Sequence, residues 1–487
     1  KFRSGARHRC ATPRVTAPAS NPPHTESRMT KKWATVAAWI IPAAAIALYF
    51  VPLLTEQSTG LLRAAAVLFL IMGLLATGAL PEYLTSLLFF LLAMALAIAP
   101  PAVVFSGFAS STLWLVFGGL LVAEAMNSTG LGGRIASALL SRVTLSYTRL
   151  ITLAVLFSTV LAFFMPATLG RILLLLPLFT AIAIRAGLKP GGKAYNGVCL
   201  AVIMSTYQCG TAILPANTPN LVLAGASETL YGVHITYAEY LLVQFPVMGL
   251  LKAVIIAALV CLLMKEEIQQ PEERKVSGAM RSDEWRLAII LLASLVLWAT
   301  DFLHGIQPGW IALGAGLLCI FPGIGVMPLT ALNDRIRLGP VFYIAAILGL
   351  GATISETGLA REMAAVLNSL LNLQPGNDFL NFMLLATMSS MAGLLTTNPV
   401  QPALLAPLAG QLAEAANWPL KATLMSFALG FTTLILPYQV PPVAVGLQVA
   451  GLSLRTALAF TLPLAAVSLL VLVPLDYLWW KFIGYLP

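Results

Sequence analysis

The sequence predicts an all-α polytopic membrane protein with about 11 transmembrane helices and two re-entrant helical hairpins in an inverted repeat. Of its 487 residues, 59% are hydrophobic and only 10% are charged, whereas a soluble domain has roughly 25% charged residues. Apolar stretches with almost no charge recur along the chain, for example at 36–54, 84–99 and 457–473. They approach the roughly 17–25 residues that span a bilayer as a helix. The second half also repeats the pattern of the first.

Eight stretches are expected to be spanning helices, near residues 33–54, 61–79, 83–99, 112–129, 238–264, 285–303, 308–321 and 340–357. Regions 148–187 and 377–413 are apolar but interrupted at the middle by Pro, Gly and polar residues, which predicts two hairpins. Regions 194–227 and 420–450 are long and interrupted by Pro-rich loops, which predicts two broken helices.

The basic residues sort to one side of the membrane if the N-terminus is cytoplasmic and each hairpin enters and leaves on one side. The inside then holds Lys31, Lys32, Arg134, Arg142, Arg149, Arg185, Lys189, Lys193, Lys265, Arg274, Lys275, Arg281, Arg286, Arg335, Arg337 and Arg455. The outside holds Arg63, Arg361, Lys421 and Lys481. Such a bias orients membrane proteins. It accounts for the net charge of +9 without nucleic-acid binding, and it predicts a C-terminus outside.

Three ordered matches, about 222 to 230 residues apart, define the repeat. The matching segments are 128–131 with 356–359, 166–169 and Pro177 with 396–399 and Pro407, and 213–219 with 435–441. Under the charge-based topology the first hairpin opens from the inside and the second from the outside, so the repeats are inverted. Helix N-termini at membrane-depth breaks suit an anion, and carbonyl ends suit a cation. This pattern therefore predicts transport of a small anion, with or without a cation.

The predicted organisation has six parts. They are an N-terminal extension that is disordered or derived from upstream sequence (1–28, with a start at Met29), N-terminal scaffold helices (29–111), repeat 1 (112–237), linking helices and a cytoplasmic loop (238–337), repeat 2 (338–450) and a C-terminal helix (451–487).

Several motifs resemble the divalent anion/sodium symporter family of sulfate and dicarboxylate carriers. They are residues 107–114 (GFASSTLW), 117–119 (FGG), 76–81 (ATGALP), the two hairpins and 210–220. The resemblance covers nearly everything after Met29. It implies a homodimer in the inner (plasma) membrane of a bacterium, surrounded by lipid. It also implies an elevator mechanism in which a di- or tricarboxylate or a sulfate-like anion is held between the hairpin tips.

The hairpin tips depart from the family pattern. Members with well-defined sodium coupling carry Ser-Asn-Thr at both tips, where the Asn and Thr hold substrate carboxylate and neighbouring carbonyls hold sodium. Here residues 167–169 are Ala-Thr-Leu, and residues 397–399 are Thr-Asn-Pro. The loss of Asn from the first tip predicts altered or absent sodium coupling, with proton coupling or anion exchange in its place.

The predicted substrate-binding residues are Ala167, Thr168, Arg171, Thr218, Pro219, Asn220, Thr397, Asn398 and Pro441. If sodium is used, its predicted site comprises Ala167, Thr168, Gly210, Thr211, Thr397, Asn398, Leu436 and Pro437. We expect no catalytic residue, no organic cofactor and no metal other than sodium.

Arg171 lies just beyond the first tip. An arginine at membrane depth costs at least about 2.5–3.5 kcal/mol, so it needs a partner, a cavity or an anion. It either binds the substrate oxyanion or acts as a fixed positive charge, or it snorkels or pairs with an acid such as Glu124. Lys252 lies mid-segment and fits snorkelling or packing better than proton relay. Asn217 and Asn220 suit a helix cap or a ligand contact.

Two other classes of protein compete with the anion carrier. A sodium/proton antiporter would need buried Asp at the helix breaks, and a membrane-embedded enzyme would need Ser/His, paired Asp or His-metal sets within the membrane. The predicted breaks hold no Asp, and Asp301 and Asp476 lie near the ends of apolar segments. The sequence has no G-x-x-x-x-G-K-[ST] loop, which argues against ATP-driven pumping by this chain.

Overall fold

The computed structural model describes residues 39–50, 59–77, 79–132, 134, 146–165, 168–266 and 279–487. These residues form helices and no strand, which confirms the all-helical prediction for the described part of the chain. The predictions for residues 1–28 and for Ala167 fall outside the described residues. Five helices are long and apolar enough to cross a membrane: Thr168–Arg185, Tyr237–Met264, Gly339–Glu356, Asp378–Leu395 and Leu454–Phe482.

The N-terminal part consists of apolar helices of different lengths. They are Trp39–Phe50, α2 (Thr59–Thr77), α3 (Glu82–Ala95), α4 (Pro101–Val104) and α5 (Ser111–Thr129). The helix expected at 83–99 ends early, at Ala95. Ala97 takes a left-handed conformation (φ 49°), and Pro101 starts the next helix, so the chain turns before the apolar stretch is complete.

Both predicted hairpins are helix–turn–helix units, and both predicted broken helices are interrupted. The first set comprises α7 (Tyr147–Ala162), α8 (Thr168–Arg185), α9 (Lys193–Gln208) and α10 (Thr218–Tyr231). The second comprises α19 (Asp378–Leu395), α20 (Val400–Leu405), α21 (Ala409–Ala416), α22 (Leu420–Ser426), α23 (Ala428–Thr432) and α24 (Pro441–Val449). By length and apolarity α8 and α19 could each cross a membrane, so re-entry stays a prediction.

A long helix with a π-turn near its middle follows each broken helix. The first comprises α11 (Tyr237–Gln244), the π-turn Phe245–Leu251 and α12 (Lys252–Met264). The second comprises α25 (Leu454–Val467), the π-turn Ser468–Leu472 and α26 (Val473–Phe482). Between the two sets lie α13 (Ser282–Ala299), α14 (Asp301–His304), α15 (Pro308–Ile320), α16 (Ala331–Asp334), α17 (Gly339–Glu356) and α18 (Leu359–Leu371).

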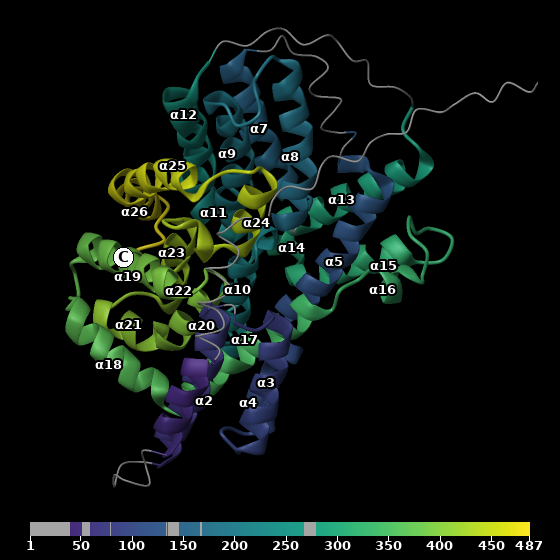
Figure 1. The fold of residues 1–487 in the computed structure, drawn as a ribbon. Coiled ribbons are helices and arrows are strands. Elements are labelled where there is room, and N and C mark those ends of the chain that lie inside the picture. The colour runs from purple at the N-terminus through teal and green to yellow at the C-terminus, as the bar shows by residue number, and fades with distance from the viewer. Residues whose placement is uncertain are drawn as a thin grey trace, which may run out of the picture.

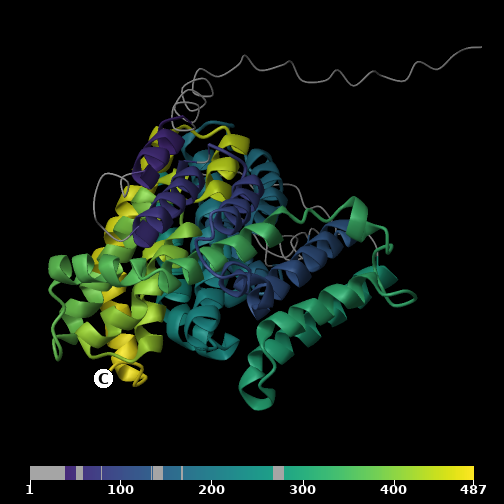
Figure 2. The ribbon, with the colours of Figure 1, turned by 90° about the horizontal axis from the view of Figure 1, so that it is seen from below.

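The helices gather into a main body with a smaller group at its side. Helices α5, α13 and α15 pack on one another and project from the body formed by the hairpins and broken helices (Figures 1 and 2). One apolar core surrounds α7, α8, α9 and α12, and another surrounds α10, α17 and the second hairpin. The two cores meet where α9 gives way to α10, so the first broken helix lies at the centre of the molecule.

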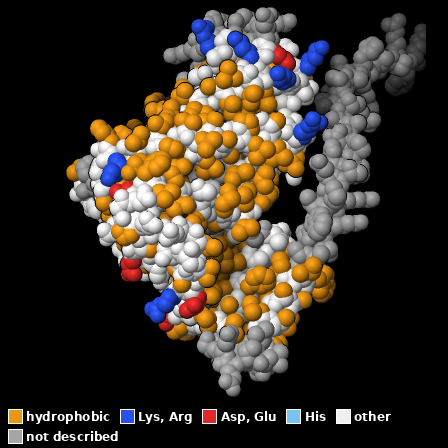
Figure 3. All heavy atoms as spheres, turned by 90° about the vertical axis from the view of Figure 1, so that its left-hand side faces the viewer, with side chains coloured by type: hydrophobic (Ala, Val, Ile, Leu, Met, Phe, Trp, Pro, Cys, Tyr) orange, Lys and Arg blue, Asp and Glu red, His pale blue; other side chains and the backbone are white. Residues whose placement is uncertain are grey.

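One face of the molecule is broadly apolar. Hydrophobic side chains cover its middle, and Lys and Arg side chains lie along its upper edge (Figure 3). Exposed apolar residues on the two long helices include Leu250, Val254, Leu262, Leu470 and Leu478. An apolar surface of this extent is what lipid contact requires, and water would disfavour it.

Helices α5 and α15 approach closely through glycines. A Cβ atom at Gly309 would lie 2.0 Å from the carbonyl oxygen of Ser111, and one at Gly118 would lie 2.2 Å from that of Ala312. Both obstacles are backbone atoms, which cannot rotate away. Small residues at helix contacts allow such approach in membrane proteins.

Substitution of Gly309 by Ala is therefore expected to destabilise the α5–α15 contact by about 1–3 kcal/mol, because the new methyl group overpacks it. Thermal unfolding of the detergent-solubilised protein measures the effect as a lower melting temperature. Gly314→Ala on the same helix is the matched control, since a Cβ at Gly314 would meet no neighbouring described residue within 4 Å. Equal melting temperatures for the two variants would contradict the close contact.

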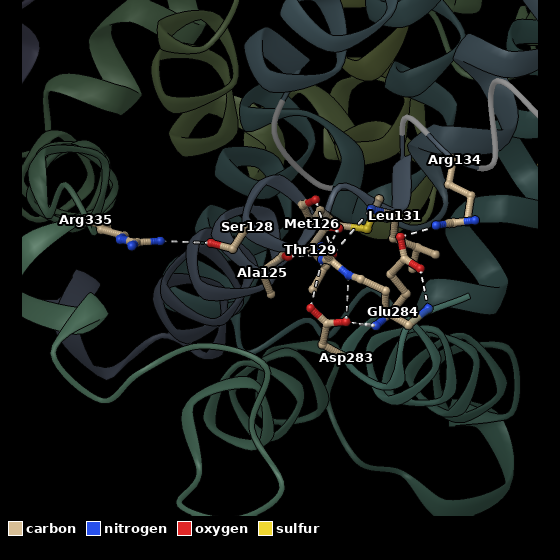
Figure 4. Close-up of polar contacts among 10 residues, drawn as sticks. Ala125, Met126, Ser128, Thr129, Leu131, Arg134, Asp283, Glu284 and Arg335 are labelled. Carbon is tan, nitrogen blue, oxygen red and sulfur yellow. Dashed lines mark hydrogen bonds and ion pairs between the residues drawn. The ribbon is translucent and has the colours of Figure 1, made fainter. Parts of the chain in front are cut away.

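A polar cluster joins the ends of α5 and α13 (Figure 4). Arg281 Nη2 donates to the Thr129 carbonyl at 3.0 Å, and Arg134 Nε donates to Glu284 at 2.9 Å. Glu284 lies in the first turn of α13, ahead of its apolar part, and accepts from the Arg281 backbone N–H at 2.7 Å. This N–H, followed by the Arg134 guanidinium, holds the pKa of Glu284 below its usual value of 4.5.

A lowered pKa in the folded state means that Glu284 stabilises the fold above pH 4.5, and that this contribution is lost as the pH falls through the lowered value. We expect Glu284→Gln to melt below wild type at pH 7 and at the same temperature under more acidic conditions. Melting curves between pH 7 and 3 test this, with the exposed Glu414→Gln as control. A difference that persists at the acid end would contradict the charge-based explanation.

Candidate functional site

Arg171 lies in the first turn of α8 and is fully buried. Its Nη1 donates a hydrogen bond to the carbonyl of Met165 in the turn of the first hairpin. Its Nη2 donates to the carbonyl of Thr206 in the last turn of α9, at 3.1 Å. Carbonyls in the last turn of a helix lack intrahelical partners and carry partial negative charge. The guanidinium thus connects the hairpin turn to the C-terminal end of a half-helix.

Thr168 and Asn217 complete the surroundings of this guanidinium. Arg171 Nη2 lies 3.4 Å from both Thr168 Oγ1 and Asn217 Oδ1. The Thr168 hydroxyl donates to Asn217 Oδ1, and Asn217 Nδ2 donates to the Tyr207 carbonyl at 2.8 Å. Asn217 precedes α10 but forms no side-chain cap. Its predicted alternative as a helix cap is wrong, because its amide is turned toward the hairpin and α9.

The hydrogen-bond partners of Arg171 are all neutral. None of the ion pairs among the described residues includes this guanidinium. Glu124 instead lies 3.4 Å from Arg335, so the predicted alternative of an Arg171–Glu124 pair is wrong. Full burial also excludes snorkelling to the interface. A buried cation without a carboxylate is costly unless an anion comes to it, so its surroundings suit a negatively charged ligand.

Asn398 lies at the tip of the second hairpin and is also fully buried. Its backbone N–H donates to the Gln439 carbonyl at 2.8 Å. Its Nδ2 donates to the Tyr207 hydroxyl at 2.8 Å and to the Phe431 carbonyl at 2.9 Å. The second tip is thereby attached to the break of the second broken helix and to the first broken helix.

Gln439 accepts hydrogen bonds from the backbone N–H groups at this second break. Its Oε1 accepts from the backbone N–H groups of Ile435 (2.9 Å) and Leu436 (2.7 Å). A helix break at membrane depth frees backbone donors that only protein or a lined cavity can satisfy. Gln439 therefore has a structural role at this break.

The last turn of α9 brings the two hairpin tips to one place. Thr206 accepts from Arg171 of the first hairpin, and the Tyr207 hydroxyl accepts from Asn398 of the second. The Tyr207 hydroxyl also donates to the Phe431 carbonyl at 2.9 Å, in the second broken helix. Three segments, the two hairpins and the second broken helix, converge on these two neighbouring residues.

The other predicted residues surround the two breaks. Asn220 Nδ2 donates to the carbonyls of Gly210 (3.2 Å) and Ile213 (2.8 Å), so it bridges the first break. The side chain of Thr218 is exposed at the start of α10. Thr397 lies in the turn of the second hairpin. The rest occupy turns or helix starts around the breaks: Thr211, Pro219, Leu436, Pro437 and Pro441.

Several buried polar atoms around the tips have no hydrogen-bond partner among the described residues. They are Arg171 Nε, Thr206 Oγ1, Gln208 Oε1 and Nε2, Asn220 Oδ1, Asn398 Oδ1 and Gln439 Nε2. Folded proteins leave few such atoms, so a group of them in one region indicates a place for a polar ligand or for water. The unpartnered atoms include hydrogen-bond donors, which suit an anion. They also include acceptors, which suit the hydroxyl groups of a ligand or bound water.

A glycine backs each tip. A Cβ at Gly210 would lie 2.8 Å from Arg171 Nη2 and 3.2 Å from Asn217 Nδ2. A Cβ at Gly393 would lie 3.0 Å from both Asn398 Oδ1 and Gln439 Nε2. Because neither glycine has a side chain, these polar groups can pack directly on the backbone. Within the described ranges no cluster of His, Cys, Asp or Glu has the arrangement of a metal site.

Apolar helices interrupted in pairs around buried polar side chains define the class of protein: this is the architecture of membrane transporters. The chain belongs to the citrate transporter family, CitMHS, whose family profile matches residues 66–432. It is therefore a multi-pass membrane transporter and not an enzyme, and the enzyme alternative is wrong.

Known relatives confirm the resemblance to anion symporters. The chain is 22% identical over 431 residues to the sodium-dependent dicarboxylate transporter SdcS of Staphylococcus saprophyticus, covering 82% of each chain. It is 23% identical over 414 residues to the chloroplastic dicarboxylate transporter 2.1 of Arabidopsis thaliana, covering 78% of this chain and 70% of the relative. It is 29% identical over 215 residues to the citrate/succinate antiporter of Escherichia coli K12, covering 40% and 42%.

A solved structure shares the fold. The crystal structure of the Alcanivorax borkumensis YdaH transporter superposes with a TM-score of 0.53 at 16% sequence identity. The match covers 93% of this chain and 98% of that one. At this identity the likeness concerns the fold alone.

Gln439→Ala is expected to lower stability, because two backbone N–H groups at the second break lose their acceptor at a cost of about 1–3 kcal/mol each. Thermal unfolding in detergent provides the measurement. Gln448→Ala, an exposed change on α24, is the matched control. If both variants have the same melting temperature as wild type, Gln439 does not stabilise the break.

Proposed function

We propose that this chain is a secondary active transporter for a small di- or tricarboxylate or a sulfate-like anion. In this proposal Arg171 is a fixed positive charge at the first hairpin tip, so transport needs little or no sodium there. The observation that carries the proposal is the fully buried guanidinium of Arg171, which is bound to the Met165 and Thr206 carbonyls and, among the described residues, to no carboxylate.

The contacts of Arg171 support the proposal that its guanidinium takes the place of a bound cation. Backbone carbonyls at a helix end are ligands that a monovalent cation would use. Here the guanidinium nitrogens already donate to two such carbonyls, one from the hairpin turn and one from α9. Its Nε–H has no partner among the described residues, and an Arg can bind a carboxylate through parallel hydrogen bonds.

The second tip offers a different set of groups. Asn398 Oδ1 and Gln439 Nε2 have no partner among the described residues, while the N-terminus of α24 follows the break directly. Substrate hydroxyl and carboxylate groups could use an amide acceptor, an amide donor and helix N–H groups together. Sodium at this second tip remains part of the proposal, with Thr397, Asn398, Leu436 and Pro437 around it.

The names of the relatives support both substrate class and variable coupling. One relative is a sodium-dependent dicarboxylate transporter and another is a citrate/succinate antiporter. A carrier with a built-in cation at one tip fits exchange of one anion for another, because the empty site retains uncompensated positive charge. That charge makes the empty carrier costly to move through a low-dielectric membrane.

The proposed movement is an elevator. The hairpins, the broken helices and the two long helices form the mobile unit, and the remaining helices form the scaffold of a homodimer in a bacterial inner membrane. The repeated order of elements and the convergence of both tips on α9 support this division. The charge bias supports a cytoplasmic N-terminus and an external C-terminus.

A sodium/proton antiporter is the competing carrier. That mechanism uses acidic residues at the helix breaks, which would bind and release the cations. Beside the first described break lies instead the guanidinium of Arg171 from the first hairpin, together with amide and hydroxyl groups. A positive charge at the break repels cations, so this alternative is disfavoured.

Arg171→Met is expected to lower the affinity for a dicarboxylate by about 10- to 100-fold, since charged hydrogen bonds contribute about 1.5–3 kcal/mol. Uptake and counterflow of radiolabelled succinate, citrate and sulfate into proteoliposomes measure the effect, with and without a sodium gradient. Wild type should exchange a dicarboxylate without sodium, and Arg171→Lys should retain part of that activity.

Arg361→Met, an exposed change on α18, controls for loss of surface charge. Elution as a single species in detergent shows that the Arg171 variants are folded. Strongly sodium-dependent uptake in wild type, together with an active Arg171→Met variant, would contradict the role of Arg171 as a fixed positive charge. Arg171 would then have a structural role.

A further inference from the structure

Four helices of the first repeat and its long helix end on one side of the molecule. At the start of α7 the Tyr147 hydroxyl donates to the Ala194 carbonyl in the first turn of α9, at 3.1 Å. A Cβ atom at Gly197 in α9 would lie 3.0 Å from the Cβ of Met264, the last residue of α12. A short loop joins the end of α8 to the start of α9. The ends of α7, α8, α9 and α12 therefore form one surface, at the top of Figure 1.

This surface carries exposed basic side chains, and we call it the basic end. They are Arg185 at the end of α8, Lys189 in the loop, Lys193 at the start of α9 and Lys265 directly after α12. Arg149 lies in the first turn of α7 on the same side. The four helices contain no Asp or Glu, and Glu266 is the acid that follows Lys265. The basic end therefore has a net positive charge.

The protein leaves this charge without internal compensation. In the part of the chain that the structure describes, no ion pair includes Arg185, Lys189, Lys193 or Lys265. Most basic side chains elsewhere have an acidic partner: Lys421 with Glu239, Lys481 with Asp378, Arg134 with Glu284, Arg281 with Asp283 and Arg335 with Glu124. A cluster of cations without counter-charges attracts an external anion.

The scaffold helices also have exposed cations without an ion pair among the described residues, but these are scattered. They are Arg286 on α13, Arg337 before α17 and Arg361 on α18. The basic end differs from them because its cations lie together on adjoining helix ends. An anion with several oxygens, or several such anions side by side, can interact with this cluster at once.

Exposed apolar side chains adjoin the basic end and indicate what kind of anion covers it. Ile184 is exposed directly before Arg185, and Leu262 is 81% exposed one turn before Lys265. Figure 3 shows Lys and Arg side chains along the upper edge of the broad apolar face. A cation above an exposed apolar side chain is the arrangement expected where lipid hydrocarbon meets the headgroups. A soluble acidic partner would leave these apolar side chains in water.

We propose that the basic end binds the headgroups of anionic phospholipids, in the leaflet that the charge bias places on the cytoplasmic side. The Lys and Arg side chains donate to phosphate oxygens, and Ile184 and Leu262 contact the acyl chains. The four cations belong to the unit that we propose to be mobile. The lipid therefore binds to this unit, and the scattered cations of the scaffold contribute little. This inference does not depend on which anion is transported.

Lipid binding to the purified protein tests the proposal. The protein in a neutral detergent is titrated with phosphatidylglycerol or with phosphatidylcholine of the same acyl chains, and bound lipid is counted by native mass spectrometry. Wild type should bind phosphatidylglycerol at least about tenfold more tightly than phosphatidylcholine. The triple variant Arg185→Gln/Lys189→Gln/Lys193→Gln should bind the two lipids with affinities within about threefold of each other.

The matched control is Arg286→Gln/Arg337→Gln/Arg361→Gln, which removes the same charge from the scaffold and should keep the wild-type preference. Salt provides a second measurement on wild type, which covers the case in which the first triple variant does not fold. Raising ammonium acetate from about 0.01 to about 1 M shortens the Debye length from about 30 to about 3 Å, and should remove the preference. Lys189→Arg/Lys193→Arg should retain it at low salt, because the charge is kept.

The lipid surface would be overturned by a wild type without the preference, by a preference that persists at about 1 M salt, or by equal losses in the two triple variants. Displacement of phosphatidylglycerol by equimolar polyglutamate would also overturn it, and would assign the basic end to a soluble acidic partner. None of these measurements requires transport. Dicarboxylate exchange in proteoliposomes therefore remains a separate test of the proposed function.

Discussion

The guanidinium of Arg171 holds together the parts of the molecule that the rest of the site depends on. It donates to the hairpin turn at Met165 and to the end of α9 at Thr206, two carbonyls that have no helical partner. Among the described residues this cation is the donor to the Thr206 carbonyl, which would otherwise be buried at the end of a half-helix without a hydrogen bond. The turn, the break and the position of Asn217 all follow from satisfying that one helix end.

Most of the helical architecture is predictable because lipid imposes a strong composition rule. Runs of apolar residues predict the spans at 112–129, 238–264 and 340–357, and the helices lie within a residue or two of these bounds. Pro and Gly at the middle of a run predict the hairpins and the breaks. The early end of α3 escapes such a prediction, because hydropathy does not register the left-handed turn at Ala97.

The type of residue at the site can be predicted from the sequence, whereas its hydrogen-bond partners cannot. A single arginine within an apolar segment can be recognised from the sequence as a candidate site residue, because few surroundings in a membrane tolerate it. Its true partners, the carbonyls of Met165 and Thr206, carry no signal in the sequence, since every residue has a carbonyl. The place of Asn217 just before α10 suggests a helix cap, whereas its actual bonds to the hairpin and α9 depend on the distant packing of α8. Lys252 lies at the middle of an apolar segment, which favours snorkelling or packing, and its fully buried Nζ donates to the Thr432 carbonyl, a partner that likewise carries no signal in the sequence.

The glycines between α5 and α15 have a consequence for motion. Each places a Cα directly against the partner's carbonyl, at Ser111 for Gly309 and at Ala312 for Gly118. Sliding one helix along the other would push these backbone atoms into each other, so this seam resists shear. Any large displacement within the molecule must therefore follow another surface, one lined by side chains that can change rotamer, and α5 and α15 travel or remain at rest as a single rigid element.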